Sequence, residues 1–292
     1  MSQSQELEQK VQIAIERIKL ASQMSEKYFE APIYICISGG KDSSVIQQLA
    51  IESGVDCIFH HSHTTVDAPP TVYFVRGEFE RLKSLGYKTQ IHYPEKSMWK
   101  LIEEANGMPP LRIARYCCKY FKEAPVRPDK KAFIVTGVRW SESNGRKSRE
   151  EFEVSASKVS NALRIKMEDQ DLERKMFEEC KLKGEKICNP IIDWTEDDVW
   201  DFLNGRNLPI NPMYKMGFKR VGCIGCPYNG DRKVLFTLWP KYKKAYIDAM
   251  ERGIKLGKEK GKVYTWEGGL NDLSSGLRIK KLAQMTYEWW MG

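Results

Sequence analysis

The sequence predicts an α/β protein, with a doubly wound, mainly parallel five-stranded sheet and a helical C-terminal appendage. First, β-rich apolar runs alternate with helical patterns, which is typical of parallel sheets that carry helices on their faces. These runs lie at 33–37, 55–60, 88–92 and 132–137. Second, an extended stretch at 187–194, I-C-N-P-I-I-D-W, supplies a fifth strand. Third, the chain changes near residue 216 to basic, aromatic-rich helical segments.

The composition favours a cytoplasmic protein of one large domain, or of a core with an appendage. The chain has 292 residues, of which 41% are hydrophobic, and a net charge of +8. No apolar run approaches the roughly 18 residues of a membrane span, and the first ten residues lack the apolar centre of a signal peptide. Eight cysteines in such a protein favour metal or redox roles over disulfides.

Three regions follow from this pattern. Residues 1–30 form an amphipathic helix, because Leu7, Val11 and Ile18 recur at helical spacing. Residues 31–215 form the α/β domain, and 216–292 hold a cysteine knuckle and the basic helical region.

The region after Pro227 permits two interpretations. It has 13 Lys and Arg against 7 Asp and Glu, together with ten aromatic residues. Basic residues with interleaved aromatics suit nucleic acid. The same pattern also describes an amphipathic appendage with its aromatics packed inward, and this second interpretation is favoured because charge runs are usually solvated surface.

The stretch from Pro32 to Glu52 organises the chain: a buried strand, a glycine turn and then a helix. This geometry presents free backbone N–H groups and the positive end of a helix dipole to an anion. The order differs from a Walker A loop, because the lysine follows the glycines at once. The predicted phosphate-binding residues are Ser38, Gly39, Gly40, Ser43 and Ser44, and Lys41 adds a cation to the turn.

The second strand runs into H-H-S-H-T-T-V-D-A-P-P, which places Thr64 and Asp67 after a strand end. Ligands of doubly wound sheets bind at the carboxyl ends of the strands. We therefore expect Thr64 and Asp67 to contact ribose or base. A purely structural loop and a metal site at the histidines are the alternatives.

A basic, serine-rich loop follows the strand at 132–137. Arg139, Arg146, Lys147 and Arg149 suit a phosphate or sulfate at that edge of the sheet, and arginine suits it bidentately. An ordinary basic surface loop is the alternative.

Two cysteine motifs lie far apart in the chain: Cys117-Cys118 and a C-x-x-C at Cys223 and Cys226. Four thiolates suffice for an iron–sulfur cluster or a tetrahedral zinc. An adjacent pair is awkward for structural zinc, so the cluster is favoured, and the absence of any metal also remains open. Cys180 and Cys188 lack partner spacing, and we expect them to be buried.

Four motifs together resemble the phosphoadenosine phosphosulfate (PAPS/APS) reductase family of the adenine-nucleotide α-hydrolase superfamily. They are S-G-G-K-D-S-S at 38–44, C-C-K at 117–119, G-V-R-W-S-E-S-N-G-R-K-S-R at 137–149, and N-P-I-I-D-W-T-E-D-D-V-W with its trailing N-P-M-Y and G-C-I-G-C.

The resemblance implies a PP-loop that binds ATP, APS or PAPS, with Mg²⁺ as an additional candidate. Lys41 and the loop amides would stabilise a departing pyrophosphate, while Asp42 would orient the loop or help to place Mg²⁺. Lys119, Arg139, Arg146 and Arg149 would contact the nucleotide or its distal anion. The resemblance also implies a 4Fe-4S cluster, held by Cys117, Cys118, Cys223 and Cys226.

One departure from the family is important. True reductases carry an E-C-G-(I/L)-H element with a nucleophilic cysteine, whereas no cysteine follows Cys226 here. The H-T-T-V-D-A-P-P loop is closer to relatives such as the DNA-phosphorothioation enzyme. We therefore expect ATP pyrophosphatase-type activation in sulfur transfer. A thiol-dependent APS/PAPS reductase and a non-catalytic nucleotide- or nucleic-acid-binding module are the alternatives. Expected partners are a sulfur donor such as a cysteine desulfurase, a thioredoxin-like reductant, or nucleic acid.

Overall fold

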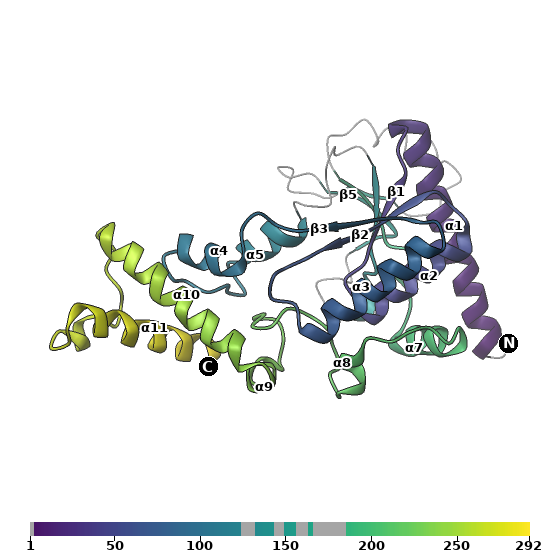
Figure 1. Cartoon of the computed structure of the whole chain (residues 1–292). Helices are drawn as coiled ribbons and strands as arrows, with labels where there is room; N and C mark the ends of the chain where they lie inside the picture. The colour runs from purple at the N-terminus through teal and green to yellow at the C-terminus, as the bar shows by residue number, and fades with distance from the viewer. Residues whose placement is uncertain (1–2, 124–131, 143–148, 156–162, 166–184) are drawn as a thin grey trace. The chain divides into compact units, whose positions relative to one another are not determined.

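The computed structural model describes residues 3–123, 132–142, 149–155, 163–165 and 185–292. The chain divides into two compact units. The first, here called the sheet unit, comprises 1–62, 70–92 and 126–219. The second, here called the cysteine unit, comprises 63–69, 93–125 and 220–292. Each unit therefore combines segments that are far apart in the sequence (Figure 1). Arg146, Lys147 and Cys180 lie outside the described residues.

The sheet unit alternates strands with helices. Its elements are α1 (Gln3–Phe29), β1 (Ile33–Cys36), α2 (Lys41–Ser53), β2 (Cys57–Ser62), α3 (Pro69–Ser84), β3 (Lys88–His92), β4 (Phe133–Val135), the 3-10 turn η2 (Trp140–Glu142), β5 (Phe152–Ser155), β6 (Leu163–Ile165), β7 (Glu185–Cys188), α7 (Glu196–Gly205) and α8 (Pro212–Lys215).

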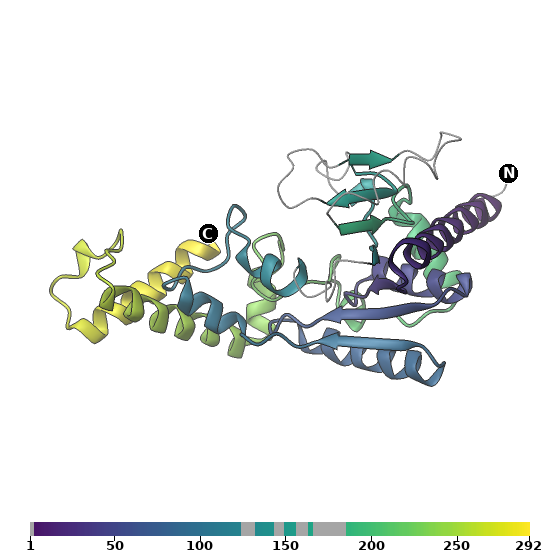
Figure 2. The same ribbon diagram turned by 90° about the horizontal axis from the view of Figure 1, so that it is seen from above.

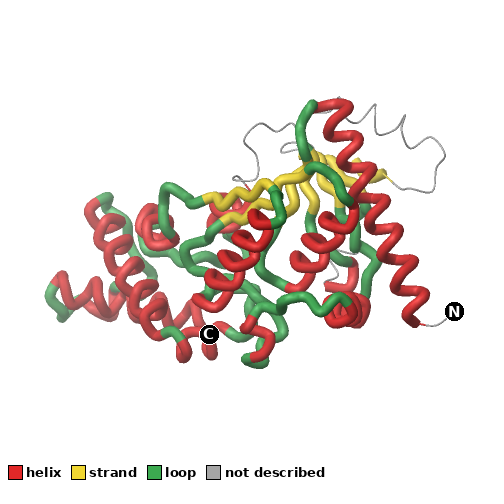
Figure 3. The backbone as a smooth tube through the Cα atoms, turned by 45° about the vertical axis from the view of Figure 1, so that its right-hand side comes forward, coloured by secondary structure: helices red, strands yellow, loops and turns green. Residues whose placement is uncertain are grey.

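The sheet has the strand order β3-β2-β1-β4-β7-β5-β6. The first five strands pair in parallel, whereas β5 pairs antiparallel to β7 and β6 antiparallel to β5. Figure 3 shows the strands in yellow beside the helices of this unit. The predicted α/β class with a mainly parallel sheet is confirmed. The predicted number of strands was too low, because β5 and β6 are short strands within a polar stretch that lacks a clear alternating pattern.

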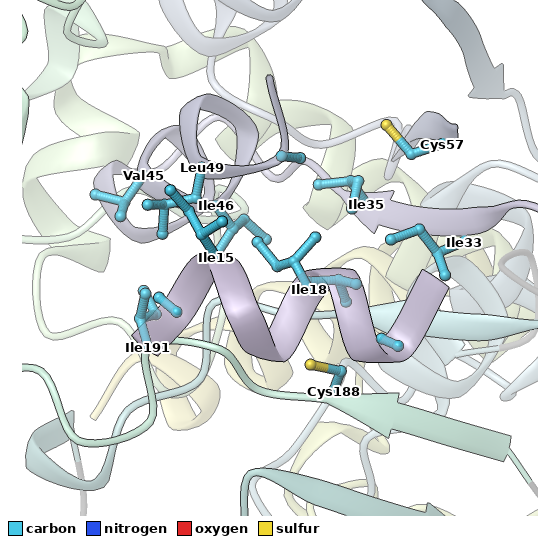
Figure 4. Close-up of a cluster of buried hydrophobic side chains, with 14 of the residues drawn as sticks. Ile15, Ile18, Ile33, Ile35, Val45, Ile46, Leu49, Cys57, Cys188 and Ile191 are labelled. Atoms are coloured by element: carbon cyan, nitrogen blue, oxygen red, sulfur yellow. The ribbon is translucent and has the colours of Figure 1, made fainter. Parts of the chain in front are cut away.

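One core covers a single face of this sheet. Ile33 and Ile35 of β1 pair with Cys57 and Phe59 of β2, and alternate residues of a strand point to the same face. These side chains share a buried cluster with residues of α1, α2, α3 and α7. Figure 4 shows part of this cluster: Ile15, Ile18, Ile33, Ile35, Val45, Ile46, Leu49, Cys57, Cys188 and Ile191. Burial of each large aliphatic side chain contributes about 1.5–3 kcal/mol.

Local sequence signals define the ends of two helices in this unit. Gly54 ends α2 with φ of 70°, in the left-handed region. Thr195 begins α7 with a capping box, in which the Thr195 side chain accepts the N–H of Asp198 and the Asp198 carboxylate accepts the N–H of Thr195.

The cysteine unit is helical in its described part. It contains α4 (Met98–Glu104), α5 (Tyr116–Cys118), the π-helix η1 (Lys119–Glu123), α9 (Arg232–Leu238), α10 (Pro240–Glu259), the 3-10 turn η4 (Gly268–Leu270) and α11 (Ser275–Met291). Figures 1 and 2 show α10 and α11 side by side.

The aromatic residues of the C-terminal region divide between two environments. Phe236, Tyr246, Tyr287 and Trp290 are buried against one another, with the Tyr246 and Trp290 ring centroids 5.0 Å apart. For these residues the inward-packed interpretation is correct. Tyr228 and Trp289 are half-exposed. No helix in the described part of the chain is long and apolar enough to cross a membrane.

Candidate nucleotide site and candidate metal centre

The glycine turn between β1 and α2 can be formed only with a very small residue at its centre. Gly39 has φ of 78°, which residues with a side chain adopt at a cost. A Cβ at Gly39 would lie 2.8 Å from Cγ2 of Val75 and 3.0 Å from Cγ2 of Thr71. Gly40 then caps α2 without a side-chain hydrogen bond. The turn is thus packed directly against α3.

Three serine hydroxyls fix the shape of this turn. Ser43 Oγ donates to the Gly40 carbonyl at 2.7 Å, and Ser44 Oγ donates to the same oxygen at 3.3 Å. Ser38 Oγ lies 3.2 Å from Ser43 Oγ and accepts the Gly40 N–H at 3.4 Å. The structure therefore brings together all seven residues that the sequence predicted for this loop.

Two supporting residues come from the segment 208–214, whose N-P-M-Y tetrapeptide was part of the family resemblance but was given no role at the turn. Asn211 is buried and donates from Nδ2 to the Gly39 carbonyl at 2.8 Å. The Tyr214 hydroxyl accepts the backbone N–H of Lys41 at 2.9 Å. The local sequence signal for these two residues is the N-P-M-Y tetrapeptide at the start of α8. A local pattern does not show that this tetrapeptide contacts the glycine turn.

A cluster of two cations and two carboxylates lies beside the turn. Arg139 is only 1% exposed. It donates from Nε to Asp42 Oδ1 at 2.6 Å and from Nη2 to Glu196 Oε2 at 2.7 Å. Lys41 Nζ lies 3.3 Å from Asp42 Oδ2 and 3.3 Å from Glu196 Oε1. The guanidinium thus links the N-terminus of α2 to that of α7, and the sequence did not identify Glu196 as part of this cluster.

The protonation of Glu196 reflects this cluster. Partial burial raises the pKa of Glu196, but the hydrogen bond from Arg139 and the charges of Lys41 and Arg139 outweigh it, so the pKa lies below its ordinary value. Glu196 is therefore an anion at neutral pH.

Arg149 is the second loop arginine that the structure describes, and its contacts differ from those of Arg139. Arg149 is partly exposed and pairs with Glu153 at 2.9 Å, and its carbonyl accepts the Trp140 indole N–H at 2.7 Å. Arg139 and Arg149 therefore have different surroundings, although the same role was predicted for both.

In the cysteine unit, both cysteine motifs line one cavity of about 30 Å³. Apolar side chains complete its wall, including Met98, Phe121 and Ile224. The C-x-x-C segment forms a turn in which the Cys226 N–H donates to the Cys223 carbonyl at 3.2 Å. Gly225 within it has φ of 78°, and a Cβ there would lie 2.9 Å from Trp290 and Tyr246.

Burial and the neighbouring thiolates raise the pKa values of the Cys117 and Cys223 thiols. A hydrogen bond with Cys118, burial and the negative charges of the other thiolates raise the pKa of Cys117. Burial raises the pKa of the Cys223 thiol to about 11. Lys122 lines the same cavity, and the thiolate of Cys223 raises the pKa of this lysine. A bound cation would remove the repulsion between thiolates, so the donor set fits a thiolate-ligated metal group.

Thr64 and Asp67 lie beside the thiols in this unit. The Thr64 hydroxyl accepts the Cys223 thiol at 3.4 Å, and the Thr64 N–H donates to Asp67 Oδ2 at 2.9 Å. Asp67 and Cys223 also form an isolated antiparallel bridge. The structure therefore brings both residues to the candidate metal centre. Lys119, in contrast, is exposed at the start of the π-helix.

Comparison of the sequence with protein families identifies the family of this chain. The family model of the phosphoadenosine phosphosulfate reductase domain matches residues 32–229. The chain belongs to this family. An uncharacterized protein of Methanocaldococcus jannaschii is 25% identical over 239 residues, which are 78% of this chain and 51% of that protein. The adenosine 5′-phosphosulfate reductase of Oceanobacillus iheyensis is 44% identical over 46 residues, 16% of this chain and 19% of the reductase. The chain thus spans about half or less of these relatives' lengths.

Two solved structures resemble this family member with low TM-scores. A phosphoadenylyl-sulfate reductase from Candida auris, in a phosphate complex, aligns with a TM-score of 0.44 and 15% identity over 76% of this chain and 96% of that one. The U34-tRNA thiolase of Methanococcus maripaludis with its 4Fe-4S cluster aligns with a TM-score of 0.42 and 12% identity over 90% of this chain and 87% of that one.

Proposed function

We propose that this member of the PAPS reductase family binds ATP at the glycine turn and activates an acceptor for sulfur transfer, with release of pyrophosphate. The observation that carries the proposal is the preorganised turn at residues 38–44. A glycine-floored helix N-terminus flanked by Lys41 suits a polyphosphate. The acceptor, the sulfur donor and the roles of individual residues all belong to the proposal.

The chemistry has two balanced steps. An acceptor oxygen attacks the α-phosphorus of ATP, a new P–O bond forms, and the bond to the β-phosphate oxygen breaks to release pyrophosphate. A sulfur nucleophile at the oxidation level of sulfide then displaces AMP from the activated carbon, which requires no net oxidation or reduction.

Lys41 is the residue whose ionic partner changes in this scheme. Its ammonium lies between Asp42 and Glu196, and the Glu196 side chain is 53% exposed. A phosphate at the turn competes with Glu196 for this ammonium, and Lys41 then stabilises the negative charge that develops on the departing pyrophosphate. Arg139 is a positioning residue: it holds both carboxylates and, through Asp42, the first turn of α2.

Mg²⁺ does not fit the carboxylates beside the turn. Both oxygens of Asp42 are within 3.3 Å of Arg139 or Lys41. The oxygens of Glu196 are taken by Arg139, Lys41 and the Trp200 indole. Two carboxylates that already neutralise two cations do not offer the hard anionic site that Mg²⁺ prefers. No step is therefore assigned to a protein-bound magnesium ion here.

The cysteine cavity is proposed to hold an iron–sulfur cluster, with Cys117, Cys118, Cys223 and Cys226 as its ligands. Adjacent Cys117 and Cys118 suit a group with several metal atoms better than one tetrahedral zinc. When bound, such a cluster supplies iron atoms that bind sulfur or stabilise negative charge nearby. The protein supplies the thiolates, an apolar wall and the Lys122 ammonium.

A thiol-dependent APS or PAPS reductase is the second candidate, favoured by the local similarity to an adenosine 5′-phosphosulfate reductase. Such an enzyme needs an accessible thiolate outside the cluster. Burial raises the pKa of Cys36 and of Cys57 to about 12, and it also raises the pKa of Cys188. Among the described cysteines outside the cavity, each is thus a poor nucleophile.

Nucleotide binding and product analysis distinguish the candidates. Anaerobically purified protein is titrated with ATP, APS and PAPS, and pyrophosphate and sulfite are then measured with each nucleotide. We expect ATP binding and pyrophosphate release, with Lys41→Ala losing at least about tenfold in affinity, the scale of a charge-assisted phosphate contact. Lys83→Ala, at an exposed position of α3, is the matched control.

Sulfite release from PAPS without pyrophosphate release from ATP would overturn the proposal in favour of the reductase. Sulfite release that survives both Cys180→Ser and Cys188→Ser would contradict the argument from available nucleophiles. ATP binding without any turnover would leave a nucleotide-binding module.

A further inference from the structure

A half-exposed aromatic ring with two arginines lies in the cysteine unit, next in sequence to both cysteine motifs. The guanidinium carbons of Arg112 and Arg115 lie 5.8 Å and 5.6 Å from the Tyr228 ring centroid, within the range of cation–π contact. The Tyr228 side chain is 48% exposed. We call these three residues the Tyr228 platform.

The platform is held together by hydrogen bonds as well as by ring contacts. Arg112 Nε donates to the Pro227 carbonyl at 3.0 Å, and the Tyr228 hydroxyl donates to the Arg112 carbonyl at 3.0 Å. The turn that carries Tyr228 is closed by the Asn229 N–H, which donates to the Cys226 carbonyl at 2.9 Å. The Arg112 guanidinium is therefore held at the ring, and the Arg115 guanidinium joins it through its ring contact.

The surroundings of the platform are basic and expose an apolar side chain. Residues 107–122 contain four cations, Arg112, Arg115, Lys119 and Lys122, and no Asp or Glu. Ile113, between the two arginines, is 95% exposed. Lys122 lines the cysteine cavity, whereas Arg112, Ile113 and Arg115 are not among its lining residues.

We propose that the Tyr228 platform binds single-stranded nucleic acid. Unpaired bases stack on tyrosine rings and on guanidinium planes, while the same guanidinium groups pair with backbone phosphates. A buried duplex base offers no free face to such a platform, so a single strand is the form that fits. An acidic protein would use the four cations, but it would have little use for an aromatic face already lined with cations.

The position of the platform connects this surface to the candidate metal centre. Arg115 lies two residues before Cys117, and Tyr228 lies two residues after Cys226. Pro227, which accepts the hydrogen bond from Arg112, also lines the cysteine cavity. A strand on the platform therefore lies beside the thiols. That this strand is the sulfur acceptor depends on the proposed function, whereas its binding does not.

Binding is tested by fluorescence anisotropy with the anaerobically purified full chain and labelled 16-nucleotide single-stranded RNA, single-stranded DNA and duplex DNA, without ATP. Tyr228→Leu removes the ring, Tyr228→Phe keeps it, and Arg115→Ala removes one cation. The matched control is Lys280→Ala, which removes one cation from an exposed position of α11 in the same unit. Iron content and thermal melting check that every variant is folded.

We expect tighter binding of single strands than of duplex. Tyr228→Leu should weaken single-strand binding roughly tenfold, as loss of one stacked base does, with Tyr228→Phe within about threefold of the parent. Arg115→Ala should weaken binding and reduce the salt slope by about one. Lys280→Ala should change the affinity less than about twofold.

Equal losses in Arg115→Ala and Lys280→Ala, or unchanged affinity in Tyr228→Leu, would overturn the platform. Competition by a polyglutamate peptide at equal charge would reassign it to an acidic protein. None of these results bears on pyrophosphate release. Strand binding without any ATP turnover would leave the platform standing and remove the proposed function.

Discussion

Charged side chains of opposite sign surround the glycine turn of the sheet unit, whereas four thiols that repel one another when ionised line the cavity of the cysteine unit. Arg139 and Lys41 neutralise Asp42 and Glu196 within the protein. In the cysteine unit, Lys122 is the one lysine among the described residues lining the cavity. The charges of the first site are balanced by its own residues, whereas the second is proposed to be completed by a cation from outside the chain.

This difference shows which changes each site tolerates. A preorganised site loses function when its supporting contacts are altered, even where the altered residue never touches the ligand. A site completed by a metal loses both the metal and the local stability that metal binding supplies when one ligand is removed. The following predictions are arranged by the size of the expected effect.

The largest effect is expected at the thiols. Cys223→Ser should reduce bound iron to background and remove the visible charge-transfer absorption, because a hydroxyl is a poor ligand for the cluster. The accompanying loss of stability should be several kcal/mol, the scale of metal-coupled folding. Iron analysis and visible spectra of anaerobically purified protein measure both. Cys57→Ser is the control and should retain its iron, since Cys57 is buried in the sheet unit.

The second effect is expected at the glycine turn. Gly39→Ala requires a side chain at φ of 78° and 2.8 Å from Val75, so it should destabilise the sheet unit by about 2–4 kcal/mol and abolish ATP binding. Gly77→Ala in α3 has nothing within 4 Å of its Cβ and should stabilise the protein by up to about 1 kcal/mol. Denaturant unfolding and ATP titration compare the pair. Equal behaviour of the two variants would show that the turn is not tightly packed.

The third effect separates two arginines of the same loop. Arg139→Met removes the buried guanidinium that donates to Asp42 and to the half-exposed Glu196, and it should cost about 1.5–3 kcal/mol, the scale of hydrogen bonds to charged groups. It should also weaken ATP binding, because Arg139 would no longer hold Asp42 in place. Arg149→Met breaks a partly exposed pair with Glu153 and should cost less than about 1 kcal/mol. Similar losses of stability in both variants would contradict the positioning role of Arg139.

The smallest effect is the pH dependence from Glu196. Its pKa is lowered in the folded protein, so its contribution to stability is complete above the ordinary pKa of 4.5 and is lost as the pH falls through the lowered value. Because Glu196 is half-exposed, the change should stay under about 1 kcal/mol. Denaturant unfolding of the parent and of Glu196→Gln from pH 7 to pH 3 measures it. The difference in the free energy of unfolding between the parent and Glu196→Gln should narrow on acidification. A constant difference would contradict the role of this carboxylate.

Local signals allowed much of the fold to be predicted. The alternation of strands and helices and the glycine turn both depend on residues close in sequence. The two cysteine motifs were predicted to converge, and all four thiols do line one cavity. That they bind a cluster stays a prediction.

What the sequence did not reveal depends on contacts between distant segments. Arg139 is buried between Asp42 and Glu196, 97 and 57 residues away in the chain, although its motif also suits an exposed anion clamp. Asn211 and Tyr214 support the turn from 172 and 173 residues away. Thr64 and Asp67 follow a strand end yet contact Cys223. No local pattern encodes these pairings, because each depends on how the chain returns to the same place.

The central claim is that the glycine turn is complete without a metal, whereas the cysteine cavity is completed by one. Hydrogen–deuterium exchange on iron-loaded and chelator-treated protein tests this claim most directly. Removal of iron should speed exchange in 93–123 and 220–230 at least about tenfold and leave 38–44 and 211–214 unchanged, while ATP should slow exchange only in the latter pair. Faster exchange around the glycine turn on removal of iron, or an unchanged cysteine unit, would contradict the account.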